Sequence, residues 1–239
     1  MAIIAISTGC TAQKVNINAA GKDIVGNGNI VKKEFSASGF NKIDVMSALN
    51  IYLIQSGSEN VVVETDEHII DYIDISVRNG ILFARFKDNC KSINVKKLNI
   101  YVNFKDLQQI QSSGSCKIFS EGKSLIFNEL TLNFNGSSEG KLEFDCKKLT
   151  MLISGASKLD ISGKVENSYI NLSGASALFA KDLIIDNCKI AVSGASTATI
   201  NANNSLEIEA RHASKVYYYG TPAHTNFETQ QSSSIKQKH

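Results

Sequence analysis

The sequence has no tryptophan, a single proline and five cysteines among 239 residues. The scarcity of proline and tryptophan argues against a linker-rich chain and against an immunoglobulin-like domain. No stretch approaches the roughly 18 apolar residues that a membrane-spanning helix needs. Charge is balanced, with 25 basic and 23 acidic side chains and a formal net charge of +2. The chain as a whole therefore lacks a strong field that would recruit nucleic acid or anionic lipid.

The cysteines match no metal-binding pattern. Cys90, Cys116, Cys146 and Cys188 form no CxxC pair and have no Cys/His spacing typical of a zinc site. They also occupy different places in the sequence pattern, so no stacked disulfide is indicated. We expect mostly free, partly buried thiols, and no metal or other cofactor.

The first thirty residues differ from the rest. "MAIIAISTGC" is a short apolar run that ends in Thr-Gly-Cys, like the end of a bacterial lipoprotein signal without its basic n-region. Cys10 is therefore a candidate for lipidation, which would anchor the protein in the cell envelope, at the outer membrane or cell surface; the alternative is an incidental thiol. The polar, Gly/Asn-rich stretch that follows is typical of a tether. Residues 1–30 are thus predicted to be a signal remnant and a flexible tether.

A Ser/Asn-Gly-x-Ser unit recurs along the second half of the chain. Counting from the glycine as position zero, the copies are Gly114, Gly136, Gly155, Gly174 and Gly194, at steps of 22, 19, 19 and 20 residues. Two degenerate copies place His212 and Ser232 at position zero, and Ser47 resembles an early copy. Internal repeats of about 20 residues indicate a solenoid.

Apolar residues alternate on both sides of each glycine. Positions minus four, minus two, plus four and plus six are mostly Ile, Leu, Val or Ala, and polar residues lie between them. This period of two predicts a strand, a tight turn and a second strand in each unit, whereas no helical period survives the turns. Since one unit cannot bury its own inner face, units must stack. The sequence therefore predicts an all-β, right-handed parallel β-helix (β-solenoid) with ~20-residue coils, six of them between residues 104 and 222, in which Ile153, Leu172 and Val192 form one interior column.

The repeated serines need not be chemical. Glycine permits the left-handed backbone of a corner, and neighbouring hydroxyls can bond the backbone groups that the turn leaves free, or one another. A catalytic serine would be needed once, whereas this unit recurs. A structural role is favoured, and a flat Ser/Ala ladder that binds a ligand is the alternative.

Residues 31–103 carry strands without the clean repeat. Asn79-Gly80 separates two alternating runs and predicts a hairpin, while "TDEHIIDYI" fits a helical turn or a bend. This N-terminal β region is either a distorted start of the solenoid or a strand layer that caps it. Residues 104–239 are then the regular coils and a C-terminal cap.

Candidate catalytic groups are sparse. Enzymes with β-helices cleave polysaccharides with clustered acids, but Asp145, Asp160, Asp182 and Asp186 fall at different repeat positions. Each is better interpreted as a solvated outward residue, and His68 as a surface histidine. We expect no enzymatic activity; a polysaccharide lyase or pectinase-like enzyme is the alternative.

The degenerate copy near the C-terminus offers a possible binding surface. Arg211 and His212 at the corner are followed by "VYYYG", in which Tyr217 and Tyr219 should point outward and Tyr218 inward. Exposed tyrosines beside an arginine can contact a sugar ring or a protein side chain. They could equally end the rod by covering its last layer.

The Asn79-Gly80 hairpin, the "LNIYVNFKDLQQIQSSGS" passage and the serial Ser-Gly-Ala-Ser units resemble the head GIN domain family of auto-transporter adhesins, over about residues 35 to 230. This resemblance implies a β-helical body, a surface location and no catalytic motif. The expected function is that of an envelope lipoprotein with an adhesin-like surface for a glycan or protein ligand. A structural envelope spacer is a further alternative. Other expected partners are the membrane, through a lipid anchor alone, and further copies of the chain, but no nucleic acid.

Overall fold

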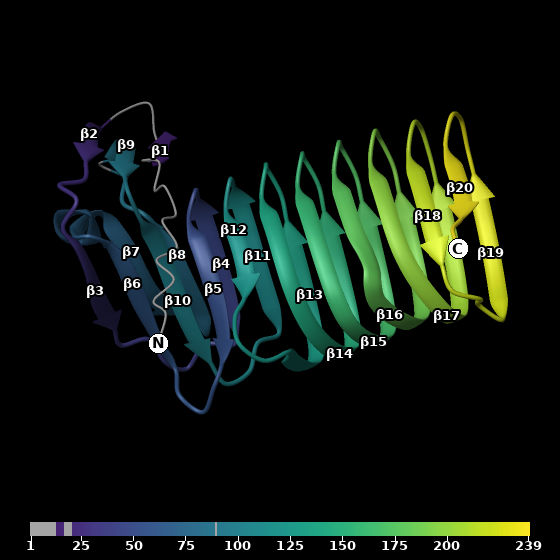
Figure 1. Cartoon of the computed structure of the whole chain (residues 1–239), viewed down its shortest axis with the longest axis horizontal. Helices are drawn as coiled ribbons and strands as arrows, with labels where there is room; N and C mark the ends of the chain where they lie inside the picture. The colour runs from purple at the N-terminus through teal and green to yellow at the C-terminus, as the bar shows by residue number, and fades with distance from the viewer. Residues whose placement is uncertain (1–12, 17–20, 89) are drawn as a thin grey trace, which may run out of the picture.

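A computed structural model describes residues 13–16, 21–88 and 90–239 (Figure 1). The chain is almost all-β, with 69% strand and 3% helix, and its parallel coils of about 19 residues stack into a β-solenoid of about 7 turns. The predicted fold class and coil length are confirmed. The earliest coil lies before residue 104 and the latest after residue 222, so the solenoid is longer than the six coils expected between them.

The elements of the N-terminal part are β1 (Gln13–Asn16), β2 (Lys22–Val25), β3 (Ile30–Phe35), β4 (Lys42–Ser47), β5 (Asn50–Gln55), β6 (Asn60–Asp66), the 3₁₀ helix η1 (Glu67–Tyr72), β7 (Ile73–Arg78), β8 (Ile81–Phe86), β9 (Cys90–Val95) and β10 (Leu98–Phe104). Those of the regular part are β11 (Gln109–Gly114), β12 (Lys117–Ser120), β13 (Leu125–Phe134), β14 (Glu139–Ile153), β15 (Lys158–Leu172), β16 (Ala177–Val192), β17 (Thr197–Ala210), β18 (Lys215–Tyr219), β19 (His224–Thr229) and β20 (Ser234–Gln237). From β11 onward the strands follow one another along the rod in chain order, whereas the later N-terminal strands β8 and β10 pair with the outer side of β4 and β5.

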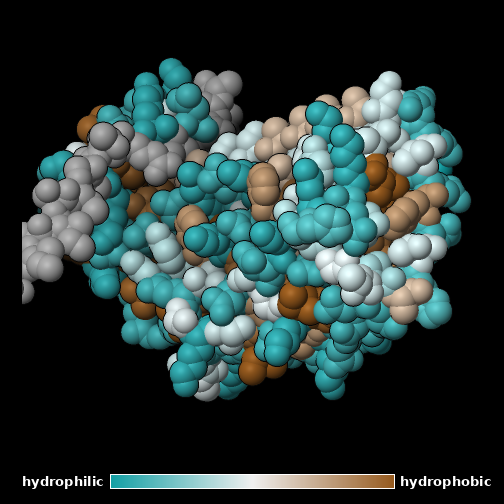
Figure 2. All heavy atoms as spheres, turned by 45° about the vertical axis from the view of Figure 1, so that its right-hand side comes forward, coloured by the Kyte–Doolittle hydropathy of each residue, from teal (hydrophilic) through white to brown (hydrophobic). Residues whose placement is uncertain are grey.

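Like side chains lie above one another in the core. Ile153 pairs with Leu172, and Leu172 with Val192, in parallel register, and all three are at most 1% exposed. The predicted interior column is thus confirmed. Because neighbouring parallel strands are about 4.8 Å apart, each such column is a continuous apolar ladder along the rod. Figure 2 shows the outer surface of one side as largely hydrophilic, with hydrophobic residues in separate spots.

The glycine of each corner lies directly against the glycine of the coil before it. The backbone N–H of Ala175 donates to the carbonyl of Gly155 at 2.7 Å, and the same bond joins successive corners from Ser47 to Gly194. Gly174 has φ +78°, and a Cβ there would lie 2.5 Å from the Gly155 carbonyl oxygen. Glycine is therefore required at this position for two reasons: the backbone is left-handed, and the preceding coil approaches too closely for a side chain.

The serines two residues after each glycine are structural. Ser138, Ser157, Ser176, Ser196 and Ser214 are at most 1% exposed and stack as one column. The hydroxyl of Ser138 donates to the carbonyl of Asn135 at 3.0 Å, and that of Ser214 to the carbonyl of Val192 at 3.1 Å. Bonding between hydroxyls, which the sequence also suggested, is seen between Ser112 and Ser138 at 2.9 Å.

The N-terminal region is both a first coil and a cap. Strands β4 and β5 flank a corner at Ser47, whose φ of +79° matches the glycines, and they pair in parallel with β11 and β12. Antiparallel strands extend each layer beyond that coil: β7 pairs with β8 through the Asn79-Gly80 hairpin, and β3 pairs with β6. The predicted hairpin is confirmed, and η1 supplies the predicted helical turn.

The last coil corrects one assignment. Gln231, with φ +59°, occupies the glycine position, because Lys215 pairs with Ser234 and Ala210 with Thr229. The prediction that Ser232 occupies the glycine position was wrong by one residue. The run Ser232–Ser234 supplies the serine two residues later whether Gln231 or Ser232 is placed at position zero. Strand β20 also pairs with β18, and Tyr218 packs on Phe227 with ring centroids 5.3 Å apart. The tyrosines of "VYYYG" therefore do not cover the last layer.

The thiols are packed in the core. Cys116, Cys146 and Cys188 are free and buried, as expected, and Cys90 is buried as well. Burial raises the pKa of Cys146 to about 11 and that of Cys188 to about 12. Hydrogen bonds with the backbone at Cys146 and with Ser168 at Cys188 lower these pKa values, but by less than burial raises them. Cys10 lies outside the described residues.

Within the described part of the chain, no helix has the length and apolar character needed to cross a bilayer.

Replacing Gly174 with alanine should lower the free energy of unfolding by about 2–4 kcal/mol, because the methyl group meets the Gly155 carbonyl and the left-handed backbone disfavours a Cβ. Gly57→Ala is the matched control: its Cβ meets nothing within 4 Å, and we expect a change within about 1 kcal/mol. Urea unfolding followed by circular dichroism measures both. Equal midpoints for the two variants would contradict the stacked-corner account.

Cys146 and Cys188 should resist alkylation in the folded protein, because the thiolate is the reactive form and burial disfavours it up to pH values well above neutral. Timed maleimide labelling at about pH 8, followed by peptide mass mapping, tests this. We expect both sites to be modified in urea and to remain unmodified on the same timescale without it. Rapid native labelling of Cys188 would show that this column is open to solvent.

Candidate binding surface

Each coil has two outward faces, because the chain reverses direction at every tight corner (Figure 1). We call the outer side of the segments before the corners the pre-corner face; over the last coils these segments are 148–153, 167–172, 187–192, 205–210 and 224–229. The outer side of the segments after the corners, 158–162, 177–181, 197–201, 215–219 and 234–238, is the post-corner face. Alternate residues on each segment are buried, so the remaining residues form the two surfaces.

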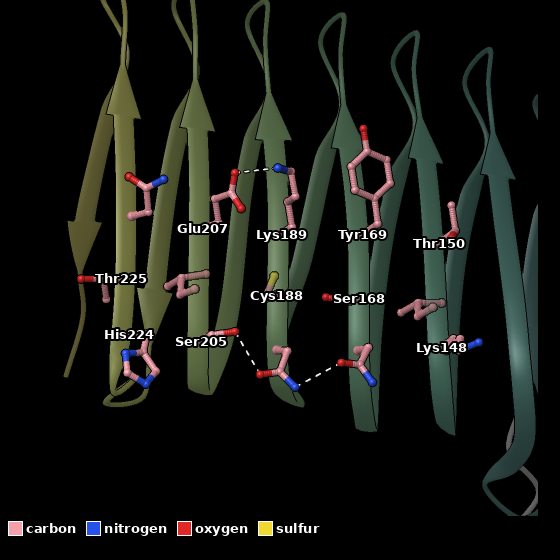
Figure 3. Close-up of a pocket in the computed structure, with 15 residues that line it drawn as sticks. Lys148, Thr150, Ser168, Tyr169, Cys188, Lys189, Ser205, Glu207, His224 and Thr225 are labelled. Atoms are coloured by element: carbon pink, nitrogen blue, oxygen red, sulfur yellow. Dashed lines mark hydrogen bonds and ion pairs between the residues drawn. The ribbon is translucent and has the colours of Figure 1, made fainter.

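A furrow of about 550 Å³ lies on the pre-corner face. It crosses five successive coils, which corresponds to about 19 Å along the rod. Its two walls are rows of outward residues seven and five positions before the corner, and Figure 3 shows both rows and the row between them. The first wall consists of Lys148, Asn167, Asn187, Ser205 and His224, and the second of Thr150, Tyr169, Lys189, Glu207 and Asn226.

The first wall is an amide ladder. The side-chain amide of Asn187 donates to Oδ1 of Asn167 at 3.1 Å, and its own Oδ1 accepts from Ser205 Oγ at 3.0 Å and from Asn204 Nδ2 at 2.8 Å. These bonds fix the orientation of the Asn187 amide. The ladder therefore presents polar groups in a preset orientation, at the spacing of the coils.

The second wall combines an aromatic ring with an ion pair. Tyr169 is 42% exposed, and its neighbour Lys189 pairs with Glu207 at 2.6 Å (Figure 3). The hydrogen bond and charge of Glu207 raise the pKa of Lys189. An exposed ring beside ordered amide and charged groups is the combination that contacts both the apolar and the hydroxyl-bearing sides of a sugar.

A smaller depression of about 300 Å³ contains two of the residues that the sequence singled out. Arg211 and His212 line it with Asn171 and Glu209, and Arg211 forms an ion pair with Glu209. His212 has φ +62°, so it keeps the corner geometry of the glycine that it replaces. The two residues lie at the corner end of the pre-corner face.

Tyr217 and Tyr219 lie on β18, after the corner, and belong to the post-corner face. Each has its ring under a lysine ammonium, Lys238 over Tyr217 at 5.1 Å and Lys181 over Tyr219 at 4.8 Å. Tyr218 points toward the core, as predicted. The structure therefore divides the four predicted binding residues between two faces.

The predicted solvated acids are exposed, but two of them share a depression. Asp145 and Asp186 line a hollow of about 390 Å³ together with Glu166 and two lysines, while Asp160 and Asp182 lie elsewhere. Asp145 accepts the backbone N–H of Lys164 at 2.9 Å, which orients this carboxylate toward the backbone. Among the described residues no three Asp, Glu, His or Cys side chains gather closely enough to hold a metal ion. His68 is bonded through Nε2 to the Val25 carbonyl at 2.8 Å.

The furrow was missed by the sequence argument, which followed the repeated positions. Its walls occupy outward positions whose residue types change from coil to coil, so they produce no motif. The available signal was the pair of aligned columns at minus seven and minus five, rich in Asn, Tyr, Lys and His.

Comparison with solved structures shows the same fold. A putative adhesin from Bacteroides fragilis superposes with a TM-score of 0.82 at 22% identity, covering 90% of this chain and all of that one. A putative lipid binding protein from Parabacteroides distasonis gives a TM-score of 0.75 at 19% identity, and a putative adhesin from the same species gives 0.73 at 18%; each covers 91% of this chain and all of its own. None of the curated proteins matches this chain by sequence.

The family model described as "Putative auto-transporter adhesin, head GIN domain" matches residues 39–222, which is more than half of the sequence. That range includes the first coil, the hairpin cap and most of the furrow. The chain belongs to this head GIN domain family.

Proposed function

We propose that the protein is a cell-surface binding module that holds a glycan chain along the furrow of the pre-corner face. The observation that carries the proposal is the furrow itself, which is about 19 Å long and has an exposed tyrosine on one wall and an oriented amide ladder on the other. This length suits an oligosaccharide rather than a single small molecule. The adhesin names of the family and of two structural relatives support a surface role.

Three features favour a glycan over a protein ligand. The walls are polar, with amide, hydroxyl and ion-pair groups in repeating positions, and the one exposed aromatic ring is Tyr169. A protein-binding patch would more often have an apolar centre. The stacked coils also present polar groups at the regular spacing of the coils, which suits a polymer that contacts several coils in succession.

The carboxylates of the furrow favour binding without cleavage. Hydrolysis of a glycosidic bond uses two carboxyl groups that flank it, whereas the furrow lining contains one, Glu207, which is paired with Lys189. We include attachment through a lipid on Cys10 in the proposal, because such an anchor would hold the module at the envelope surface.

Tyr169→Ala should weaken oligosaccharide binding about tenfold, because the ring supplies the apolar contact, and Asn187→Ala should weaken it several-fold by removing the centre of the ladder. A glycan array with the full chain selects a ligand, and calorimetry then measures its dissociation constant for each variant. Leu152→Ala is the matched control: it is an exposed apolar residue of the same face outside the furrow lining, and it should change affinity less than about twofold.

Absence of any array ligand, or equal losses for Tyr169→Ala and Leu152→Ala, would contradict the furrow as the binding site. Release of reducing ends from the bound glycan, lost on replacing Asp145 or Asp186, would instead favour the enzyme alternative at the acidic hollow.

A further inference from the structure

Lysines gather on the post-corner face of the last four coils. Twelve outward positions occur there, in the segments 177–181, 197–201, 215–219 and 234–238. Four of the twelve are lysine and none is a carboxylate; the others are aromatic, hydroxyl, amide or alanine side chains. We call this surface the lysine face. Its lysines are Lys181, Lys215, Lys236 and Lys238.

These four ammonium groups are not neutralised by neighbours. All four side chains are exposed, and the described residues place no carboxylate within ion-pair distance of any of them. Three lysines elsewhere on the described rod have acidic partners: Glu139 for Lys117, Glu129 for Lys148 and Glu207 for Lys189. The nearest acids flank the lysine face: Asp160 pairs in register with Phe179, and Asp182 follows Lys181.

Aromatic rings accompany the charges. Phe179 is 42% exposed, and Tyr217 and Tyr219 lie half-buried beneath Lys238 and Lys181. Phe179, Thr199, Tyr217 and Lys236 form one row across the four coils. The face thus mixes cationic and amphipathic aromatic side chains, as surfaces that lie at a membrane interface do.

The face is also flat and broad. The furrow, the acidic hollow and three smaller depressions of the described structure are all lined by residues outside this face. Four strands of five residues cover roughly 300 Å², and the lysines are spread over both dimensions of that area rather than along one line. A flat array of charge complements an anionic plane better than a single anionic chain, which would need a track.

We propose that the lysine face rests on an anionic phospholipid bilayer. Each lysine gains from the negative surface potential within a Debye length, and the aromatic rings reach the headgroup region. Because the pre-corner and post-corner faces lie on opposite sides of the core, this seating turns the furrow away from the membrane. The inference rests on the charges, aromatic rings and shape of the lysine face and does not require the furrow to bind a glycan.

Vesicle flotation with the full 239-residue chain tests the proposal. Phosphatidylcholine vesicles with roughly one-third phosphatidylglycerol should bind the protein, whereas pure phosphatidylcholine vesicles should not, and binding should fall steeply between about 0.05 M and about 0.5 M NaCl. The variant K181Q/K215Q/K236Q should lower the partition coefficient about 100-fold, since each lysine near such a surface is worth about fivefold.

The control variant K22Q/K105Q/K123Q removes three exposed lysines that lie outside the lysine face and has the same net charge. Its partition coefficient should fall by no more than about threefold, because the lower net charge weakens only the long-range attraction to the vesicle. Equal losses in the two triple variants, or no difference between anionic and neutral vesicles, would overturn the proposal. So would lysine-face binding to heparin without any binding to vesicles, since that result identifies a soluble polyanion as the partner.

Discussion

The structure depends on one contact, in which the glycine carbonyl of a corner accepts the next coil's N–H. This bond brings two backbones so close that a side chain on the upper glycine would overlap the lower carbonyl. The contact fixes the register of successive coils. This register places Ile153 on Leu172 inside the core and Asn167 on Asn187 at the surface. Every column, buried or exposed, therefore follows from the geometry of the corner.

The corner also explains where the repeat weakens. At the His212 position a Cβ is present, and among the described hydrogen bonds none joins Ala213 to the Gly194 carbonyl as at the earlier corners. The coil nevertheless continues, because the strands on both sides of the corner keep their ladders: Val192 pairs with Ala210 and Thr197 with Lys215. Strand pairing thus preserves the register where the glycine contact is lost.

The fold was predictable from the sequence because its physical cause repeats. Apolar residues that alternate with polar ones around a recurring glycine can all be buried when the units stack as coils. The same alternation identified Ile153, Leu172 and Val192 as neighbours. The final corner was misplaced by one residue because Ser232, Ser233 and Ser234 satisfy the motif equally, and only strand pairing distinguishes Gln231 as the residue with positive φ. The N-terminal cap was predictable as strands but not as a topology, since antiparallel pairing of β3 with β6 leaves no periodic trace.

Function was harder to predict for the same reason. The core imposes its pattern on alternate residues and leaves the outward ones unconstrained, so binding groups can accumulate there without forming a motif. Tyr169 and Lys189 become neighbours only because their coils stack. The formal charge of +2 likewise suggested a surface without a strong field, yet that sum conceals lysines gathered on one side and ion pairs on the other. In a solenoid the relevant unit for electrostatics is the face, because a flat rod separates its two faces by the full thickness of an apolar core. Charge averaged over such a chain therefore says little about what either side can bind.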